Sequence, residues 1–480
     1  MIDVVFAFDV EDVVNPSSDD AALRLSQIFT EEEVPVAMFI AGEKARTMRQ
    51  RGRQDVLAAL SRHEICTHGN YWADFPIPAL VYGQEMPWDE AVKYALSVEL
   101  PGLHDLAEMT GQFPVAWCCH QAQQSAPLQY ALKLAGVRCW AGGPRGWIMN
   151  WLSWPRSNCT LSNQGSCQQR VDYLNFDQLK PPCDPDADLR AVQEQFERMA
   201  ETKSFISFAG HPVCWVTSEW ALDEWAVLFR KGVPGPFPRP AHFLPQQPRS
   251  PEDQEAAYTF VRKLLRWIKG VGGVNLTNYT QLCERDEEDP VKWLTWEQVG
   301  ELARRVLADF NYTTAFGTSF SCADMIGVFC FAVDYAWRNH CWPDHIPVQR
   351  LLGPTEPPLH LDEPLTIKRE DIVAGAAAQY AIMMDERRLA GKLKASFTSV
   401  GPAEFLHVLA EFIAQSQAQG GMPLEVSIPV VPLYPKVIDE PAITERRFGS
   451  TSSPADLSHE KLWEMLRWQS WSYRPAVARG

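Results

Sequence analysis

The sequence predicts an α/β protein in which a parallel sheet closes into a barrel over residues 1–285, followed by a mainly helical, internally duplicated region. Three observations predict this class. Up to about Leu282, short apolar runs alternate with amphipathic helical periods. The pattern changes after the acidic run that begins at Glu284, and residues 291–440 contain a weak internal repeat. A chain of 480 residues is also long enough for two or three domains.

Seven apolar runs of the first region have the length and composition of buried strands: Val4 to Val10, Pro35 to Ala41, Glu64 to His68, Pro114 to His120, Val137 to Ala141, Phe205 to Ala209 and Gly273 to Thr277. Helical periodicity separates them at Asp19 to Thr30, Glu90 to Met109, Pro127 to Ala135, Asp186 to Thr202, Glu219 to Arg230 and Pro251 to Lys269. Strands interleaved with helices imply a parallel sheet, and this length suits a barrel. The irregular segment from Gly142 to Asp184 is expected to be a long loop over the barrel mouth.

The second region reads as helices joined by proline-rich connectors. An Ala-acid-apolar-apolar motif at Ala323 recurs 80 positions later at Ala403, and the same shift carries Pro343 onto Pro423. This predicts two copies of a helix-rich module over residues 291–440. The tail, residues 441–480, contains an amphipathic helix from Ser458 to Trp471 that is expected to dock on another part of the chain.

Composition and charge narrow the class of protein. Hydrophobic residues make up 46 % of the chain and charged residues 22 %, which is a globular balance. The net charge of -16 argues against nucleic acid and anionic membranes as partners. The chain enters a strand directly, without the features of a signal peptide, and its twelve cysteines form no C-x-x-C pair. We therefore expect a cytoplasmic protein whose cysteines are mostly buried.

An acidic cluster follows the first predicted strand, where Asp9, Glu11 and Asp12 share four positions. Catalytic groups collect just past the carboxyl ends of parallel strands. Crowded carboxylates repel one another, so a bound cation, a shared proton or a shifted pKa is expected there. The alternative is that these acids cap the following loop and helix.

Two histidines occupy matching positions. His68 ends the third predicted strand, and His211 follows the sixth. In a barrel, both would meet the acidic cluster at one mouth. The other histidines weighed, His63, His104 and His242, are expected to be capped or at the surface.

The stretches that carry these residues are F-D-V-E-D, H-E-I-C-T-H-G-N, F-A-G-H-P and the closing strand V-N-L-T. Together they resemble the polysaccharide deacetylases of carbohydrate esterase family 4, over roughly residues 1–285. The resemblance implies a distorted (β/α)7 barrel. It also implies that Asp9 is the general base and His211 the proton donor to the leaving group. Glu11, or as the alternative Asp12, would bind a divalent metal together with His68, with zinc as the expected ion.

The sequence departs from the family pattern at two places. Trp72 stands where the family has its second metal histidine, and Asp74 is the nearby candidate to replace it. The sequence W-C-C-H-Q stands where an arginine motif is expected, and His120 within it could fill the vacant ligand position. A metal-free or inactive site stays open.

Cysteine and tryptophan side chains near this mouth allow two interpretations. Cys118 and Cys119 could be a nucleophile or a ligand, although buried cysteines at a strand end are the preferred interpretation. The tryptophans could stack on sugars or simply pack; they are Trp140, Trp147, Trp151 and Trp154.

The function predicted from these residues is deacetylase-like, metal-dependent hydrolysis of an amide C–N bond in an N-acyl sugar or related small amide. The alternatives are a cytosolic cyclic amide or ureide hydrolase and a catalytically silent barrel that binds a saccharide or a partner. The expected partner is a carbohydrate or small amide substrate, and a homo-oligomer stays open.

Overall fold

A computed structural model describes residues 1–71, 86–118, 126–141, 173–176, 181–201, 205–218, 246–287, 291–395, 398–439 and 460–473. The helix predicted from Glu219 to Arg230 lies outside these ranges, as do residues 142–172 and 177–180 of the segment predicted to be a long loop.

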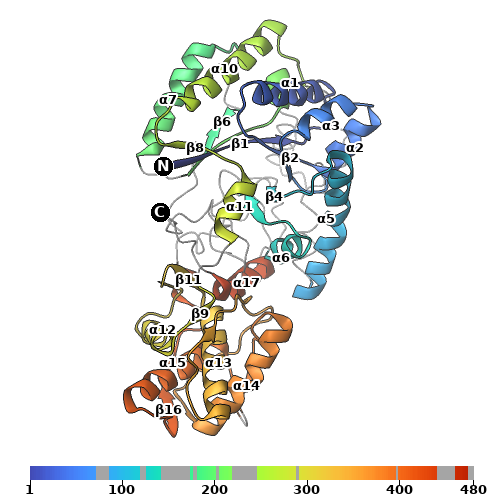
Figure 1. The fold of residues 1–480 in the computed structure, drawn as a ribbon. Helices are drawn as coiled ribbons and strands as arrows, with labels where there is room; N and C mark the ends of the chain where they lie inside the picture. Colours follow the sequence, from blue (N-terminus) through green and yellow to red (C-terminus); the bar gives the residue numbers. More distant parts are fainter. Residues whose placement is uncertain are drawn as a thin grey trace.

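The first part of the chain is built on one curled, parallel sheet that forms about half a barrel (Figure 1). Its strands are β1 (Ile2–Val10), β2 (Ala37–Ile40), β3 (Glu64–Thr67), β4 (Ala116–Cys118), β5 (Cys139–Ala141), β6 (Tyr173–Asn175), β7 (Phe205–Gly210) and β8 (Val274–Leu276). They follow the order β5-β4-β3-β2-β1-β7-β6, with β8 also paired to β1.

Strand β1 is the centre of the sheet and takes three partners. Asp3 pairs with Phe205 of β7 on one edge and with Asn275 of β8 on the other. Further along, Ala7 pairs with β7 and with Ala37 of β2. Strands β8 and β2 therefore pair with the same edge of β1, β8 with residues 2–4 and β2 with residues 7–10.

Both faces of β1 are buried, which explains its continuous apolar sequence. On the outer face, Phe6 and Phe8 lie in one core with helices α1 (Ser17–Glu31), α3 (Gln54–Leu60), α7 (Pro185–Ala200) and α10 (Pro251–Lys269). On the inner face, Val5 and Ala7 share a second core with α11 (Tyr279–Glu287). Figure 1 shows α11 on the opposite side of the strands from α1 and α10.

The remaining helices of this part are α2 (Gly42–Gln50), α5 (Trp88–Thr110), α6 (Ala126–Leu134) and the short α8 (Val213–Val216). Helices α2 and α5 pack against each other, and α6 packs on α5. Two glycines allow the first of these contacts, because a Cβ on Gly42 would lie 2.8 Å from the Gly102 Cα.

The structure differs from the predicted barrel in two respects. Within the described ranges the sheet has eight strands rather than seven, because β6 lies inside the segment predicted to be a loop. Among the described residues, β5 and β6 are the two edges of the sheet, so these strands form an open half-barrel instead of a closed one.

The second part of the chain contains the same order of elements twice. The first set is β9 (Trp293–Leu294), α12 (Trp296–Ala308), β10 (Thr313–Ala315), β11 (Thr318–Phe320), α13 (Cys322–Asn339) and β12 (Ile346–Pro347). The second set is β13 (Leu365–Lys368), α14 (Arg369–Glu386), β14 (Leu393–Ala395), β15 (Thr398–Val400), α15 (Pro402–Gln419) and β16 (Glu425–Ile428). In each set the outer strands pair with each other and the inner strands form a hairpin. The two sets therefore share one order of elements and one pattern of strand pairing, and their origin by duplication stays a prediction.

The helices of the two sets pack against each other in crossed pairs. Helix α12 packs on α15, and α13 packs on α14, so each first helix meets the second helix of the other set. A segment of the chain joins β12 of the first set to β13 of the second. In each set, a buried acid at the start of the second helix accepts a hydrogen bond from this segment. Asp324 accepts a hydrogen bond from the Leu351 N–H (3.0 Å), and Glu404, 80 positions later, accepts one from the Leu361 N–H (2.9 Å).

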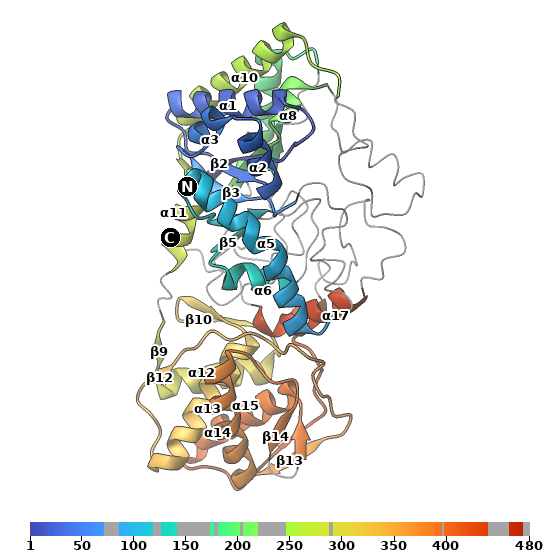
Figure 2. The same ribbon diagram turned by 90° about the vertical axis from the view of Figure 1, so that its right-hand side faces the viewer.

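The end of the described chain lies between the two parts (Figure 2). Helix α17 (Glu460–Trp468) and the 3-10 helix η8 (Gln469–Ser472) place Met465, Trp468 and Tyr473 in one buried cluster with Trp88 of α5 and Trp117 of β4. None of the helices in the described ranges is both long and apolar enough to span a membrane.

Candidate metal-binding and catalytic site

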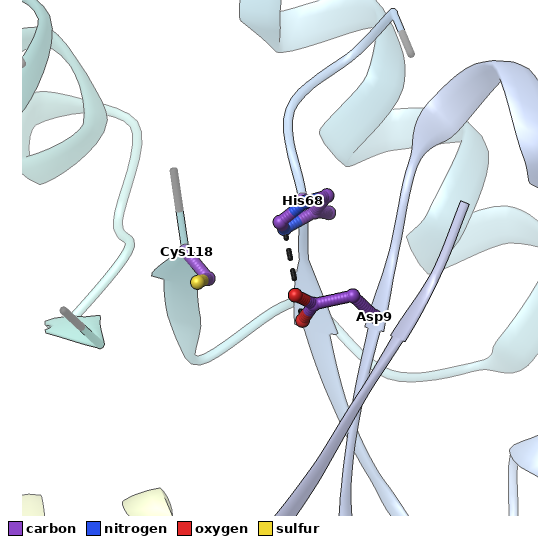
Figure 3. Close-up of side chains that lie close together, drawn as sticks. All are labelled: Asp9, His68 and Cys118. Atoms are coloured by element: carbon purple, nitrogen blue, oxygen red, sulfur yellow. Dashed lines mark ion pairs between the residues drawn. The ribbon is translucent and has the colours of Figure 1, made fainter. Parts of the chain in front are cut away.

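Five chemically active side chains gather at the carboxyl ends of four strands. Asp9 is the penultimate residue of β1, and Glu11 follows the same strand. His68 follows β3, Cys118 is the last residue of β4, and His211 follows β7. Parallel strands place these positions at one edge of the sheet. Figure 3 shows three of the side chains, Asp9, His68 and Cys118, close together.

His68 lies between two carboxylates. Its Nδ1 is 3.8 Å from Asp9 Oδ1, and its Nε2 is 3.1 Å from Glu11 Oε2. The side chains of His68 and Glu11 are only 3 % and 2 % exposed, whereas that of Asp9 is 17 % exposed. The separation from Glu11 is that of an ion pair, while 3.8 Å is too long for a hydrogen bond. Glu11 therefore fixes the imidazole so that Nδ1 faces Asp9.

His211 contacts the other oxygens of the same two acids. Its Nε2 lies 3.3 Å from Asp9 Oδ2 and 3.4 Å from Glu11 Oε1. The four side chains thus form a ring in which carboxylates and imidazoles alternate. His211 is 22 % exposed, which makes it the most accessible member of this ring.

The charges in the ring shift its pKa values. Burial alone raises the pKa of Asp9, but the neighbouring His68 and His211 outweigh it, and the pKa lies below its usual value. Burial lowers the pKa of His68, but the charges of Asp9 and Glu11 outweigh this effect and raise it. A proton on His68 therefore balances the acids when no cation is bound, and a cation can take over that role.

The loop after His68 is held firmly by its neighbours. Gly69 has a φ of +84°, which favours glycine. The Asn70 side chain donates a hydrogen bond to a backbone carbonyl of α5 (2.6 Å) and accepts one from Arg46 (2.9 Å). The backbone of His68 itself is tied to β2 through a bond to the Ile40 carbonyl (3.1 Å). The site is therefore preorganised on this side.

A second buried acid supports the site from behind. Glu99 of α5 accepts a hydrogen bond from the Asn70 N–H (3.0 Å). Burial raises the pKa of Glu99 to about 7, although the hydrogen bond from the Asn70 N–H opposes this. Because Asn70 lies two residues after His68, this carboxyl group braces the loop that follows the histidine.

The donor set fits a divalent metal ion. Asp9, His68 and Cys118 each offer one ligand atom, and these three atoms lie within 4.8 Å of one another. Figure 3 shows the three side chains converging from three strands. One oxygen, one nitrogen and one sulfur ligand suit zinc and similar ions.

Some of the predicted site residues lie together in the structure and others do not. It brings Asp9, Glu11, His68 and His211 together. Asp12 instead accepts hydrogen bonds from the Val14 N–H (2.7 Å) and from the backbone and side chain of Asn15. For this one acid, the loop-capping alternative describes its contacts. Asp74 and His120 lie outside the described residues.

The remaining candidates lie away from the site or outside the described ranges. His63 lies 2.9 Å from the Ser26 carbonyl, and His104 is exposed on α5. The candidates for which the structure describes no side chain are Cys119, Trp140, Trp147, Trp151, Trp154 and His242.

Sequence reasoning underrated two residues. Cys118 is buried, in agreement with the preferred interpretation of its sequence position, yet it also belongs to the group of possible metal ligands. Its position at a strand end was the available signal, shared with His68. Glu99 gave no signal, because a single acid in an amphipathic helix looks like a solvated residue.

No protein-family model matches the chain, and no curated protein matches it. Solved structures do resemble it. A probable polysaccharide deacetylase from Pseudomonas aeruginosa PAO1 is 14 % identical, with a TM-score of 0.36 over 61 % of this chain and 93 % of the other. Puue allantoinase is 14 % identical, with a TM-score of 0.35 over 59 % and 89 %. A CE4 family pseudoenzyme from Bacillus anthracis is 13 % identical, with a TM-score of 0.31 over 58 % and 64 %. Likenesses at these values carry no argument about this chain, so both its fold and its activity have to follow from its own residues.

Proposed function

We propose that this protein is a metal-dependent hydrolase of the deacetylase type that cleaves the C–N bond of an N-acyl sugar or related small amide. The observation that carries the proposal is the ring of two carboxylates and two imidazoles at the carboxyl edge of the sheet. The resemblance of F-D-V-E-D and H-E-I-C-T-H-G-N to family motifs agrees with it.

Each member of the ring has a separate role in this proposal. Asp9 and His68 would hold a divalent cation, which when bound would supply charge to polarise a carbonyl and to acidify water. Asp9 directs Oδ1 towards His68 and Oδ2 towards His211, so one oxygen can bind the cation while the other accepts a proton. Glu11 keeps the His68 imidazole in position.

His211 is assigned to the leaving group. It is the more exposed of the two imidazoles, and its Nε2 contacts both carboxylates, which favour a proton at that atom. A proton donated from Nε2 converts the departing nitrogen into an amine, and general acid catalysis of this kind contributes about 10²- to 10⁴-fold.

The proposal is tested by metal analysis and product assays on the full chain. We expect near-stoichiometric divalent metal by mass spectrometry, with the metal lost in His68→Ala. Acetate release is measured on N-acetylated sugars, and ring opening on cyclic amides and ureides. Ring opening without acetate release would favour the cyclic amide alternative over the N-acyl sugar.

A matched pair of variants tests the role of His211. We expect His211→Gln to keep its metal and to lose about 10²- to 10⁴-fold in kcat. His104→Gln, which changes an exposed histidine on α5, should leave kcat unchanged. If the purified protein contains no metal and releases neither product, the proposed hydrolase activity is wrong. The alternative of a catalytically silent barrel that binds a saccharide or a partner would then remain.

A further inference from the structure

We propose that the third ligand of the metal is the thiolate of Cys118, so that Asp9 Oδ1, His68 Nδ1 and Cys118 Sγ bind one thiophilic divalent ion of the zinc class. This inference rests on the site of the proposed function and goes beyond it, because it assigns the ligand that the altered motifs leave vacant. It also moves Glu11 from metal ligand to positioning residue.

The first step concerns which nitrogen of His68 faces the metal. Nε2 is occupied by its ion pair with Glu11 at 3.1 Å, so Nδ1 is the nitrogen directed towards Asp9. Metal bonds of about 2.0–2.3 Å in a tetrahedron separate neighbouring ligand atoms by roughly 3.3–3.6 Å. The 3.8 Å between Nδ1 and Asp9 Oδ1 is close to that separation.

The second step concerns the direction of Cys118. Along β4, Ala116 and Cys118 belong to the inner core with Val5 and Ala7 of β1, whereas Trp117 belongs to the buried cluster with Trp88 of α5. Successive side chains of a strand point to opposite faces. Cys118 therefore lies on the inner face. Asp9 lies on that face too, because it follows Val5 and Ala7 at two-residue spacing along β1.

The third step is that the strand bearing Cys118 is fixed on both sides. Strand β4 pairs with β3 at Thr67, the residue before His68, and with β5 along its full length. On the other strand, Glu99 accepts a hydrogen bond from the Asn70 N–H (3.0 Å) and so braces the loop that follows His68. Backbone pairing of β3 with β4 thus fixes the strands that carry the two ligands side by side.

The fourth step concerns charge and coordination. A bound thiolate and the Asp9 carboxylate together neutralise a divalent ion, and the thiol proton is released on binding. Three protein ligands leave the fourth position of a tetrahedral zinc site for water or substrate. Glu11 then acts as the carboxylate that holds the far nitrogen of a ligating histidine, an arrangement common around metal sites.

Cobalt substitution of the full chain tests the inference by spectroscopy. We expect Co²⁺ to give a sulfur-to-cobalt charge-transfer band in the near ultraviolet, and Cys118→Ser to lose it and to bind Zn²⁺ and Cd²⁺ at least tenfold more weakly. The matched control is Cys139→Ser, which changes a buried cysteine on the same inner core, in the neighbouring strand. It should keep the band and the affinity.

Two further variants separate this site from a site centred on Glu11. Glu11→Gln should keep the charge-transfer band, with Zn²⁺ affinity about 10- to 100-fold lower, as for other outer-sphere partners. Loss of all metal in Glu11→Gln, with metal and spectrum retained in Cys118→Ala, would overturn the inference. Thermal unfolding of the metal-free variants shows that each has folded.

The two proposals can fail independently. A cobalt–thiolate band in protein that hydrolyses no amide would contradict the proposed function and keep the metal site. Amide hydrolysis by metal-loaded protein that shows no such band would keep the function and contradict the assignment of Cys118.

Discussion

At the scale of single residues, the site works through carboxylates in three different environments. Asp9 is partly exposed and its pKa is lowered by two imidazoles. Asp12, three positions later, caps a loop with its oxygens. Glu99 is buried in α5 with a pKa of about 7. Environment, rather than residue type, therefore decides which acid binds, which caps and which braces.

The raised pKa of Glu99 predicts a pH dependence of stability. The folded carboxyl keeps its proton up to about pH 7, whereas the unfolded one loses it near the ordinary value of 4.5. The folded state therefore binds more protons between these values, and stability falls as the pH rises through them. The contribution of this group falls by about 3 kcal/mol in total.

Replacing Glu99 tests this dependence. We expect the unfolding free energy of metal-free Glu99→Gln to change less between pH 5 and pH 8 than that of the parent chain, by up to about 3 kcal/mol. Urea unfolding at the two pH values measures the difference. Glu108→Gln changes an exposed acid of the same helix and should behave like the parent. Equal pH profiles for all three proteins would show that Glu99 is not the responsible group.

A site residue could be predicted only where its position in the sequence made it stand out. Asp9, Glu11, His68 and His211 were found because polar residues at the ends of apolar runs stand out in sequence. Their roles are proposals that depend on distances of a few tenths of an ångström, which no sequence pattern encodes. Glu99 reaches the site from a helix across the fold, so only the tertiary packing reveals it.

At the scale of elements, the loop after β3 depends on the close approach of α2 and α5. Asn70 lies against both helices, and its backbone and side chain bond to each of them. A Cβ on Gly102 would lie 2.9 Å from the Asn70 Cα and 2.8 Å from its Oδ1. The glycine therefore sets how near the helix can come to the loop that carries His68.

This contact predicts the effect of a single methyl group. Gly102→Ala should destabilise the fold by about 1–3 kcal/mol through overpacking, although alanine is the better helix former. It should also weaken metal binding, because Asn70 is two residues from His68. Thermal unfolding and Zn²⁺ titration measure the two effects. Gly272→Ala, where the added Cβ meets open space, should change neither.

Elements were predictable in proportion to their length. Helix α10 was predicted with its observed bounds, because its apolar stripe runs over nineteen residues. Strand β6 spans three residues, too few to establish a period, and was assigned to a loop. The paired strands of the second part were missed for the same reason. Helix α2 was missed because its basic residues mask a buried face that includes Lys44, whose ammonium group bonds to Asp19.

At the scale of the whole molecule, the second part is joined to the sheet by a buried cluster. Met465, Trp468 and Tyr473 share that cluster with Trp117, the residue beside Cys118. An ion pair between Arg388 and Asp89 (2.9 Å) links the same two parts at the surface. The C-terminal helix thus supports the face of β4 opposite to the one that carries Cys118.

This junction predicts that the two parts unfold together. Trp468→Ala should destabilise the protein by about 3–5 kcal/mol, because a large buried side chain leaves a cavity. Calorimetry should show one transition that moves to lower temperature. Leu424→Ala removes a leucine that is 72 % exposed and should shift the transition little. A variant that splits the melt into two transitions, with the first part unchanged, would show that the parts are energetically independent.

The pairing of β1 with three other strands has a consequence for the synthesis of the protein. Its partners on β7 and β8 lie about 200 and 270 residues further along the chain. A nascent polypeptide therefore exposes the longest strand of the sheet, with Asp9 near its end, until these later strands have been made. Strands completed so late fold slowly and are open to aggregation until they are paired. Production of active protein should accordingly respond to chaperone supply and to the speed of the ribosome more strongly than to the stability of the finished fold.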